Sequence, residues 1–244
     1  MTQAVKKAVR GTGVREAAAQ TTRDNILRAA TKVFARYGYE GGSVEKISKL
    51  AKSYDRMIYY YYGSKEALFV AVLEGIYRRM DEAESKVAPD PSDPVEALKT
   101  IIRFKLDYYR RNPDFVNLLN TENLHKGRHV SRLERKGDYS TLAVDIIGGI
   151  LASGADQGIF RRDLNARDVF LLIASTAYFY TSNRYTLTVF LGVELDTPEA
   201  VQHWESFVID SVLRVVRVEA ATSELPATPD KPPRRRQQDA SLSS

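Results

Sequence analysis

Apolar residues recur along this chain with the spacing typical of α-helices. In the first such segment they occupy positions i, i+4, i+7, i+8 and i+11, which is one face of a helix. The residues on that face are Ile26, Ala30, Val33, Phe34 and Tyr37. Similar stripes cover residues 95–109 and 142–150. The pattern predicts an all-α protein of about nine helices, with no convincing strand.

Three proline dipeptides predict where later helices begin. They are Asp93-Pro94, Asn112-Pro113 and Thr197-Pro198. In each, a side-chain oxygen caps the first turn, and proline occupies the first helical position, where no N–H donor is needed. The other predicted helix starts are capped by Thr21, Ser43, Ser64 and Asn165. Gly38 is predicted to end the first helix.

Positive charge is concentrated in the first third of the chain. Residues 1–69 contain 13 Lys and Arg against 6 Asp and Glu, whereas residues 70–244 contain 23 and 25. An excess of this kind is typical of a surface that binds nucleic acid, and a solvated basic surface is the alternative. The basic run Arg234–Arg236 in the C-terminal tail could also touch nucleic acid non-specifically, but a solvated tail is the favoured interpretation of these three residues.

Composition also bears on whether the chain is a disulfide-bonded, metal-binding or membrane protein. The chain has no Cys, which excludes disulfides and cysteine metal sites. His125 and His129 are four residues apart, but Gly127 lies between them and no third ligand is evident, so we expect neither a metal nor a cofactor. No apolar run is long enough to cross a membrane, and no leader is apparent. We expect a cytoplasmic protein with no membrane partner.

Three short helices between residues 21 and 66 predict a helix-turn-helix. The run from Ser43 to Phe69, SVEKISKLAKSYDRMIYYYYGSKEALF, resembles the DNA-binding signature of the TetR/AcrR family of bacterial transcriptional regulators. The resemblance implies a helix-turn-helix domain at residues 21–66 and a ligand-binding and dimerisation domain at residues 67–221. The sequence outside these domains predicts a disordered basic arm at residues 1–20 and a disordered tail, with almost no apolar residue, at residues 222–244.

The resemblance also implies which residues meet DNA. Arg56 and Met57 would contact base edges, the tyrosines would contact the backbone and groove, and Ser43 and Lys65 would contact phosphates. Tyr62 is expected to pack in the core instead. The full predicted set is Ser43, Lys52, Ser53, Tyr54, Arg56, Met57, Tyr59, Tyr60, Tyr61 and Lys65.

The turn departs from the family pattern of Gly, an apolar residue and a Ser cap. The chain has Lys52, Ser53 and Tyr54 at these positions. Lys52 must therefore adopt a backbone conformation that glycine reaches more easily. Ser53 is expected to cap the third helix in place of the displaced serine.

Two helices late in the chain are apolar on more than one side: the one predicted at about residues 166–190 and the last one, which starts near residue 198. This is expected of helices that pack both on their own core and on a second subunit. The resemblance implies a homodimer interface there, and full burial in a monomer is the alternative. The predicted interface residues are Phe170, Ala177, Trp204, Val208 and Val212.

The resemblance also implies a cavity for a small-molecule effector in the region 95–190. The alternative is that its polar residues are satisfied structural groups. The predicted ligand residues are Phe104, Tyr108, Phe115, Leu119, Glu122, Asn123 and His125.

The resulting prediction is a repressor that a small molecule releases from a palindromic, double-stranded operator. A regulator that activates or needs no ligand, and a non-sensing architectural DNA protein, are the alternatives. A remote one is an oxidoreductase, because Tyr61 and Lys65 match the Tyr-x-x-x-Lys pair of short-chain dehydrogenases. That class also needs a glycine-rich phosphate loop after a strand, which the sequence lacks.

Overall fold

The computed structural model describes residues 2–133 and 141–218. Within these ranges the regular structure is helical, with ten α-helices, one 3-10 turn and an isolated bridge between Phe160 and Arg217. The helices are α1 (Thr2–Gly41), α2 (Val44–Ala51), α3 (Asp55–Tyr62), α4 (Lys65–Glu84), α5 (Pro94–Arg111), α6 (Pro113–Leu124), η1 (Val130–Arg132), α7 (Thr141–Asp156), α8 (Ala166–Ser182), α9 (Arg184–Leu191) and α10 (Pro198–Val216). The predicted tail at residues 222–244 lies outside the described ranges.

Most of the predicted caps are present. Side-chain oxygens accept backbone N–H bonds at the starts of α2, α4, α5, α8 and α10, and the acceptors are Ser43, Ser64, Asp93, Asn165 and Thr197. Asn112 precedes α6 as predicted but makes no such bond. Its amide instead donates to the Tyr108 carbonyl at 2.8 Å, at the end of α5.

The first helix begins earlier than predicted. Residues 2–20, predicted to be a disordered arm, form the first part of α1. The cap predicted at Thr21 is wrong, since its hydroxyl donates to the Ala17 carbonyl inside the helix. Ala17, Ala18 and Ala19 are strong helix formers, so local preference favours continuation. Gly38 interrupts the helix as predicted, with a φ of 69°.

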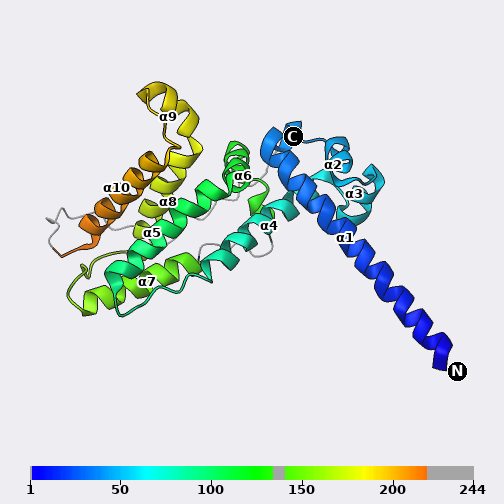
Figure 1. Cartoon of the computed structure of the whole chain (residues 1–244), viewed down its shortest axis with the longest axis horizontal. Helices are drawn as coiled ribbons and strands as arrows, with labels where there is room; N and C mark the ends of the chain where they lie inside the picture. Colours follow the sequence, from blue (N-terminus) through cyan, green and yellow to red (C-terminus); the bar gives the residue numbers. More distant parts are fainter. Residues whose placement is uncertain (1, 134–140, 219–244) are drawn as a thin grey trace, which may run out of the picture.

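The helices form a small head, with α1, α2 and α3, and a larger body (Figure 1). α1 packs against α2, α4 and α6, and one buried cluster joins α1–α4 to α6. A second cluster is formed by α5, α7, α8 and α10. α4 leads from the head into the body, so a displacement of α4 would change contacts in both parts of the molecule.

Candidate DNA-binding surface and effector pocket

The head is a small tripod around fully buried side chains. Phe34 of α1, Ile47 of α2, Ile58 of α3 and Leu68 of α4 have no exposed surface. Burying a side chain of this size contributes about 1.5–3 kcal/mol. Because Ile58 is the one residue of α3 that is fully buried, the side chains on the opposite face of the helix are available for other contacts.

In the turn between α2 and α3, the backbone conformation is the one that the sequence predicted, but the side chain predicted to cap α3 does not do so. Lys52 adopts the left-handed conformation, with φ 51° and ψ 45°. The cap predicted at Ser53 is wrong, because Tyr54 occupies the N-cap position of α3 without a side-chain cap bond. The buried Ser48 hydroxyl instead donates to the Asp55 carboxylate, which fixes the first turn of α3 to α2.

Replacing Lys52 by glycine is expected to raise the free energy of unfolding by about 1 kcal/mol, since a side chain in the left-handed region carries a steric cost. Lys49→Gly is the matched control, because Lys49 is an exposed position inside α2. It is expected to lower the same quantity by about 1 kcal/mol. Urea denaturation of both variants measures the difference, and equal effects would contradict strain at Lys52.

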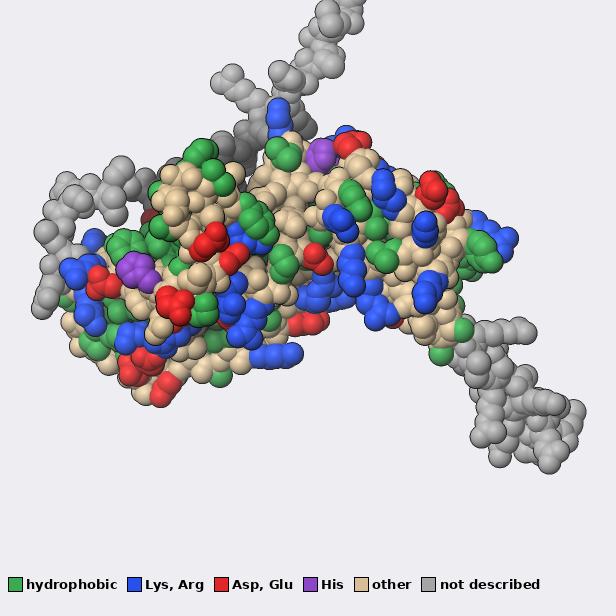
Figure 2. Space-filling view, turned by 45° about the horizontal axis from the view of Figure 1, so that its top comes forward, with side chains coloured by type: hydrophobic (Ala, Val, Ile, Leu, Met, Phe, Trp, Pro, Cys, Tyr) green, Lys and Arg blue, Asp and Glu red, His purple; other side chains and the backbone are tan. Residues whose placement is uncertain are grey.

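The exposed face of α3 carries the predicted aromatic residues. Tyr54, Tyr59 and Tyr60 are 71%, 52% and 77% exposed. The guanidinium of Arg56 lies 5.4 Å from the centre of the Tyr54 ring, on the same face. Several Lys and Arg side chains lie on the surface of the head (Figure 2). Exposed rings and guanidinium groups on a basic surface have the chemistry of a DNA-reading helix.

Other predicted DNA residues are partly engaged within the protein. Met57 and Tyr61 are half-buried against the head core. The Lys65 ammonium donates to the Glu40 carbonyl at 3.4 Å and lies 4.7 Å from the centre of the Tyr39 ring. Tyr62 packs as predicted, and its hydroxyl donates to the Arg23 carbonyl at 3.0 Å.

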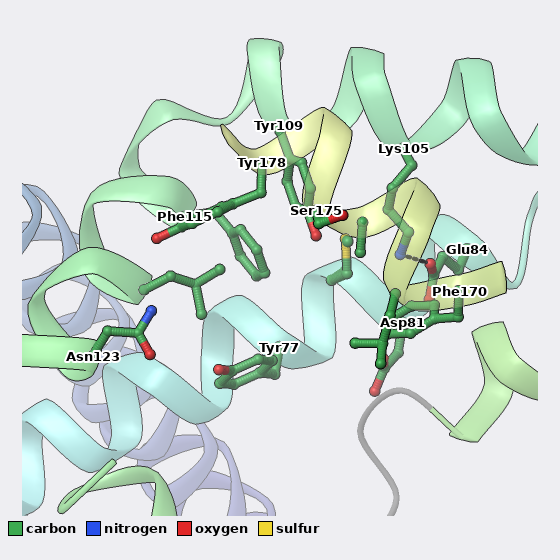
Figure 3. Close-up of a pocket in the computed structure, with 14 residues that line it drawn as sticks. Tyr77, Asp81, Glu84, Lys105, Tyr109, Phe115, Asn123, Phe170, Ser175 and Tyr178 are labelled. Atoms are coloured by element: carbon green, nitrogen blue, oxygen red, sulfur yellow. Dashed lines mark hydrogen bonds and ion pairs between the residues drawn. The ribbon is translucent and has the colours of Figure 1, made fainter. Parts of the chain in front are cut away.

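A cavity of about 350 Å³ lies in the body (Figure 3). Four helices line it. The residues are Tyr77, Met80, Asp81 and Glu84 of α4, Lys105 and Tyr109 of α5, Phe115, Leu119 and Asn123 of α6, and Phe170, Leu171, Ala174, Ser175 and Tyr178 of α8. A mostly apolar cavity with a few polar groups is the usual form of a small-molecule site.

Three of the seven predicted ligand residues line this cavity, and the other four do not. Phe115, Leu119 and Asn123 line it, and so does Phe170, which was predicted for the dimer interface. The other four predicted residues, Phe104, Tyr108, Glu122 and His125, are not among its lining residues.

Lys105 and Glu84 form the polar end of the cavity, and the sequence analysis missed both. They are 2% and 5% exposed and form an ion pair between the end of α4 and the middle of α5 (Figure 3). The Lys105 ammonium also lies 5.4 Å from the centre of the Phe170 ring. The signal for Lys105 was its place on the apolar stripe of α5, three residues after Ile102 and four before Tyr109.

Burial raises the pKa of the tyrosines around the cavity. Burial, reinforced by the Glu84 carboxylate, raises the pKa of Tyr109. Burial also raises the pKa of Tyr108 on the adjacent side of α5 to about 12. A raised pKa in the folded state favours the protonated phenol. The contribution to stability is therefore complete below the unfolded value near 10 and is lost as the pH rises.

We therefore expect the free energy of unfolding to fall between pH 10 and pH 12, and to fall less steeply in Tyr109→Phe. Denaturant titrations across this range measure the slope. Tyr60→Phe, which removes a hydroxyl from an exposed ring, is the control. Parallel slopes for Tyr109→Phe and the wild type would show that this phenol does not ionise on unfolding.

The predicted dimer interface needs correction. Ala177, Val208 and Val212 are buried within the single chain, so they are unavailable to a second subunit. Trp204 stacks on the Tyr180 ring at 4.8 Å. These residues form the inner side of helices that are apolar on two sides. Their outer sides expose Phe179 of α8 and Phe207 and Val215 of α10.

The head meets the body where α6 and η1 contact the ends of α1 and α4. The buried Glu122 carboxylate accepts the N–H groups of His129 at 2.6 Å and Val130 at 2.9 Å, and its second oxygen lies 2.8 Å from Nδ1 of His129. The His129 ring packs on the rings of Tyr39 and Phe69, with centroids 4.6 and 4.8 Å away. Glu122 is therefore a structural group, the alternative that the sequence analysis left open.

Exposed ion pairs surround this junction. Glu66 of α4 lies 2.7 Å from Arg132 and 3.3 Å from Arg128. The hydrogen bond from Arg132 holds the pKa of the Glu66 carboxyl below its usual value. His125 lies beside the same junction, with its ring 5.7 Å from that of Tyr39. The polar segment that was predicted to hold a ligand thus joins the two parts of the molecule.

Residues 26–72 match the family described as bacterial regulatory proteins, tetR family, and residues 94–212 match the tetracyclin repressor-like C-terminal domain. The chain is 49% identical over 208 residues to the HTH-type transcriptional repressor NicS of Pseudomonas putida, covering 85% of this chain and 98% of that protein. The chain belongs to the TetR family. It is also 33% identical over 175 residues to the HTH-type transcriptional regulator RutR of Escherichia coli, covering 70% of this chain and 80% of that protein.

Solved structures of transcriptional regulators share the fold. The ketosteroid transcriptional regulator KstR2 of Mycobacterium tuberculosis aligns with a TM-score of 0.60 and 18% identity, covering 81% of this chain and 95% of that one. A TetR transcription regulator from Haloarcula marismortui aligns with a TM-score of 0.58 and 18% identity, covering 81% and 98%. The predicted all-α fold is confirmed, and the chain is a DNA-binding transcriptional regulator.

The oxidoreductase alternative has no support. The relatives of this TetR-family chain are transcriptional regulators. Tyr61 lies in α3 and Lys65 begins α4, with Gly63 between them, so the Tyr-x-x-x-Lys spacing does not place the two side chains on one helix.

No helix in the described ranges has the length and apolar character that a membrane span requires.

Proposed function

We propose that this chain is a homodimeric repressor that leaves its operator when a small molecule occupies the cavity between α4, α5, α6 and α8. The observation that carries the proposal is the course of α4. This helix begins beside the DNA-reading face at Lys65 and ends in the cavity at Glu84. Repression is supported by the name of the relative that is 49% identical.

Two heads are needed to read a palindromic operator. Recognition helices of a dimeric helix-turn-helix protein must be about 34–36 Å apart to enter successive major grooves. The exposed apolar faces of α8 and α10 offer the surface for such a dimer. A ligand that binds more tightly when α4 is tilted would change the separation of the heads, and the population would shift to the form that binds DNA weakly.

The DNA half of the proposal is tested at Arg56, which is exposed on α3. A duplex selected from random sequence by the wild-type protein serves as operator. Arg56→Ala is expected to lose about 1–3 kcal/mol of binding free energy and to lose discrimination at one base pair of each half-site. Arg78→Ala, an exposed change in the middle of α4, is the control. A uniform loss on every operator variant would show that Arg56 contacts phosphate and not a base.

The ligand half is tested with a library of small organic molecules. Compounds that raise the melting temperature of the purified protein are expected to weaken its binding to the selected duplex. Leu119→Trp, which fills part of the cavity, is expected to abolish both effects. Stabilising compounds that leave operator affinity unchanged, or that still bind Leu119→Trp, would place the effector elsewhere.

A further inference from the structure

An open cleft of about 580 Å³ lies between the head and the body. α1, the end of α2, α4 and α6 line it, and it shares no lining residue with the effector cavity. Its cations are Arg28 and Lys32 of α1, Lys52 in the turn after α2, and Arg79 of α4, and its one carboxylate is that of Asp114 at the start of α6. Residues from four separate segments of the chain thus bring charge to one hollow.

The charge of this lining differs from that of the other cavities in the body. The effector cavity has one cation, Lys105, against the two carboxylates of Asp81 and Glu84. A cavity against α5, α8 and α10 has two arginines against three carboxylates. The cleft has four cations against one carboxylate, and none of the four forms an ion pair within the described ranges. Cations that converge without counter-charges repel one another, so the cleft favours an anionic occupant.

The donors of the cleft suit a phosphate group. Arg28 and Arg79 each carry a planar guanidinium, which can form two parallel hydrogen bonds to one phosphate, and the two lysines add point charges. The Arg28 guanidinium donates to the side-chain oxygen of Asn25, which also lines the cleft, so the group is held at the wall. No aromatic ring is among the lining residues, so the cleft offers no surface on which a nucleobase would stack. Recognition would therefore depend on the phosphate and not on a ring attached to it.

The DNA backbone is a poorer fit as the source of that phosphate. α4 begins beside the DNA-reading face at Lys65, and Arg79 lies fourteen residues further along the same helix. A helix rises about 1.5 Å per residue, which places Arg79 about 21 Å from that end of α4. Asp114, on the other wall of the cleft, belongs to α6 in the body. The cleft therefore extends away from the surface that would contact a duplex, to a depth that a small anion can reach.

We propose that this cleft binds a small molecule that carries a phosphate group, such as a phosphomonoester or a diphosphate. A phosphate monoester carries about two negative charges near neutral pH, which the excess positive charge of the cleft offsets. The bound anion would contact cations of α1 and of α4 at the same time, and it would resist movement of the head relative to α4. The site is independent of the proposed effector cavity and would add a second small-molecule input to the same chain.

The experiment uses inorganic pyrophosphate, which presents phosphate without an organic group. Its binding to the full-length protein is measured by isothermal titration calorimetry, at an ionic strength held constant with sodium chloride. The cleft variant is Arg28→Gln with Arg79→Gln. The matched control is Arg36→Gln with Arg78→Gln, which removes two exposed arginines from the same two helices at positions outside the cleft. Both variants lose the same charge, and Lys52, which the sequence predicts to contact DNA, is left in place.

Pyrophosphate is expected to bind one site per chain in the wild type and in the control. In the cleft variant the dissociation constant is expected to be at least about tenfold higher, because two charge-assisted contacts are lost. Saturating pyrophosphate is expected to raise the melting temperature of the wild type and of the control, and to leave that of the cleft variant nearly unchanged. Equal weakening in both variants would show only a general attraction to basic surface and would overturn the site. Absence of saturable binding to the wild type would overturn it as well.

Binding to the selected duplex separates a free anion from the DNA backbone. Each phosphate contact adds about 0.9 to the slope of log K against log salt concentration. The cleft variant and the control are expected to bind the duplex with equal slopes. A slope that is smaller by about two in the cleft variant alone would assign Arg28 and Arg79 to DNA phosphates, and it would overturn a site for a free anion.

Discussion

Lys105→Ala is expected to lower the free energy of unfolding by about 3–5 kcal/mol, because it leaves a buried carboxylate without its counter-charge. The partner, Glu84, is only 5% exposed at the end of α4. Urea denaturation at neutral pH measures the loss, and an effect this large would be among the strongest of any single substitution in the body.

Two controls separate this effect from simple loss of packing. The double variant Glu84→Leu with Lys105→Met removes both charges while keeping apolar volume, and it is expected to approach wild-type stability. Arg78→Ala breaks the exposed pair with Glu82 at 3.7 Å, and it is expected to cost at most about 1 kcal/mol. If Lys105→Ala costs no more than Arg78→Ala, the pair is hydrated in solution.

The position of the pair also connects stability to the proposed regulation. Glu84 is the last residue of α4, and Lys105 lies in the middle of α5, so the pair fastens the far end of α4 to the body. In the proposed mechanism a ligand acts by favouring another tilt of α4. The double apolar variant removes that attachment without a buried charge. It is therefore expected to bind the selected operator with a different affinity even though its stability is close to that of the wild type.

Local chemistry allowed the sequence to predict most of the fold. Ser43, Ser64, Asp93, Asn165 and Thr197 cap the helices as predicted, because a cap depends on residues within one turn of it. The exposed rings of α3 could also be predicted from local sequence, because the core of the head is too small to bury all four tyrosines of one eight-residue helix.

Features that depend on distant residues were not predictable in this way. The helices α8 and α10 are apolar on two sides, and the sequence pattern does not say which side faces a partner. Ala177 and Val212 were therefore placed on the wrong side. Lys105 and Glu84 are 21 residues apart, and nothing near either residue indicates the other. Ser53 was expected to cap α3, but the bond between Ser48 and Asp55 holds that turn across two helices.

Glu122→Ala is expected to lower the free energy of unfolding by about 3 kcal/mol or more, since each buried donor left without an acceptor costs about 1–3 kcal/mol. The Glu122 carboxylate serves two backbone N–H groups and the His129 ring at the junction of head and body. Glu122→Gln keeps one oxygen for the backbone donors, and it is expected to lose less. Chemical denaturation of the two variants measures both values.

The same junction explains why this change should also affect regulation. Glu122 lies on α6, which presents Leu119 and Asn123 to the cavity and, through His129, packs on Tyr39 at the end of α1. Loosening the contact is therefore expected to weaken the effect of a stabilising compound on operator affinity, even where the compound still binds. Glu66→Ala, which breaks only exposed pairs at this junction, is the control and is expected to lower stability much less than Glu122→Ala. A Glu122→Ala protein that responds to the compound as fully as the wild type would show that the signal reaches the head through α4 and not through α6.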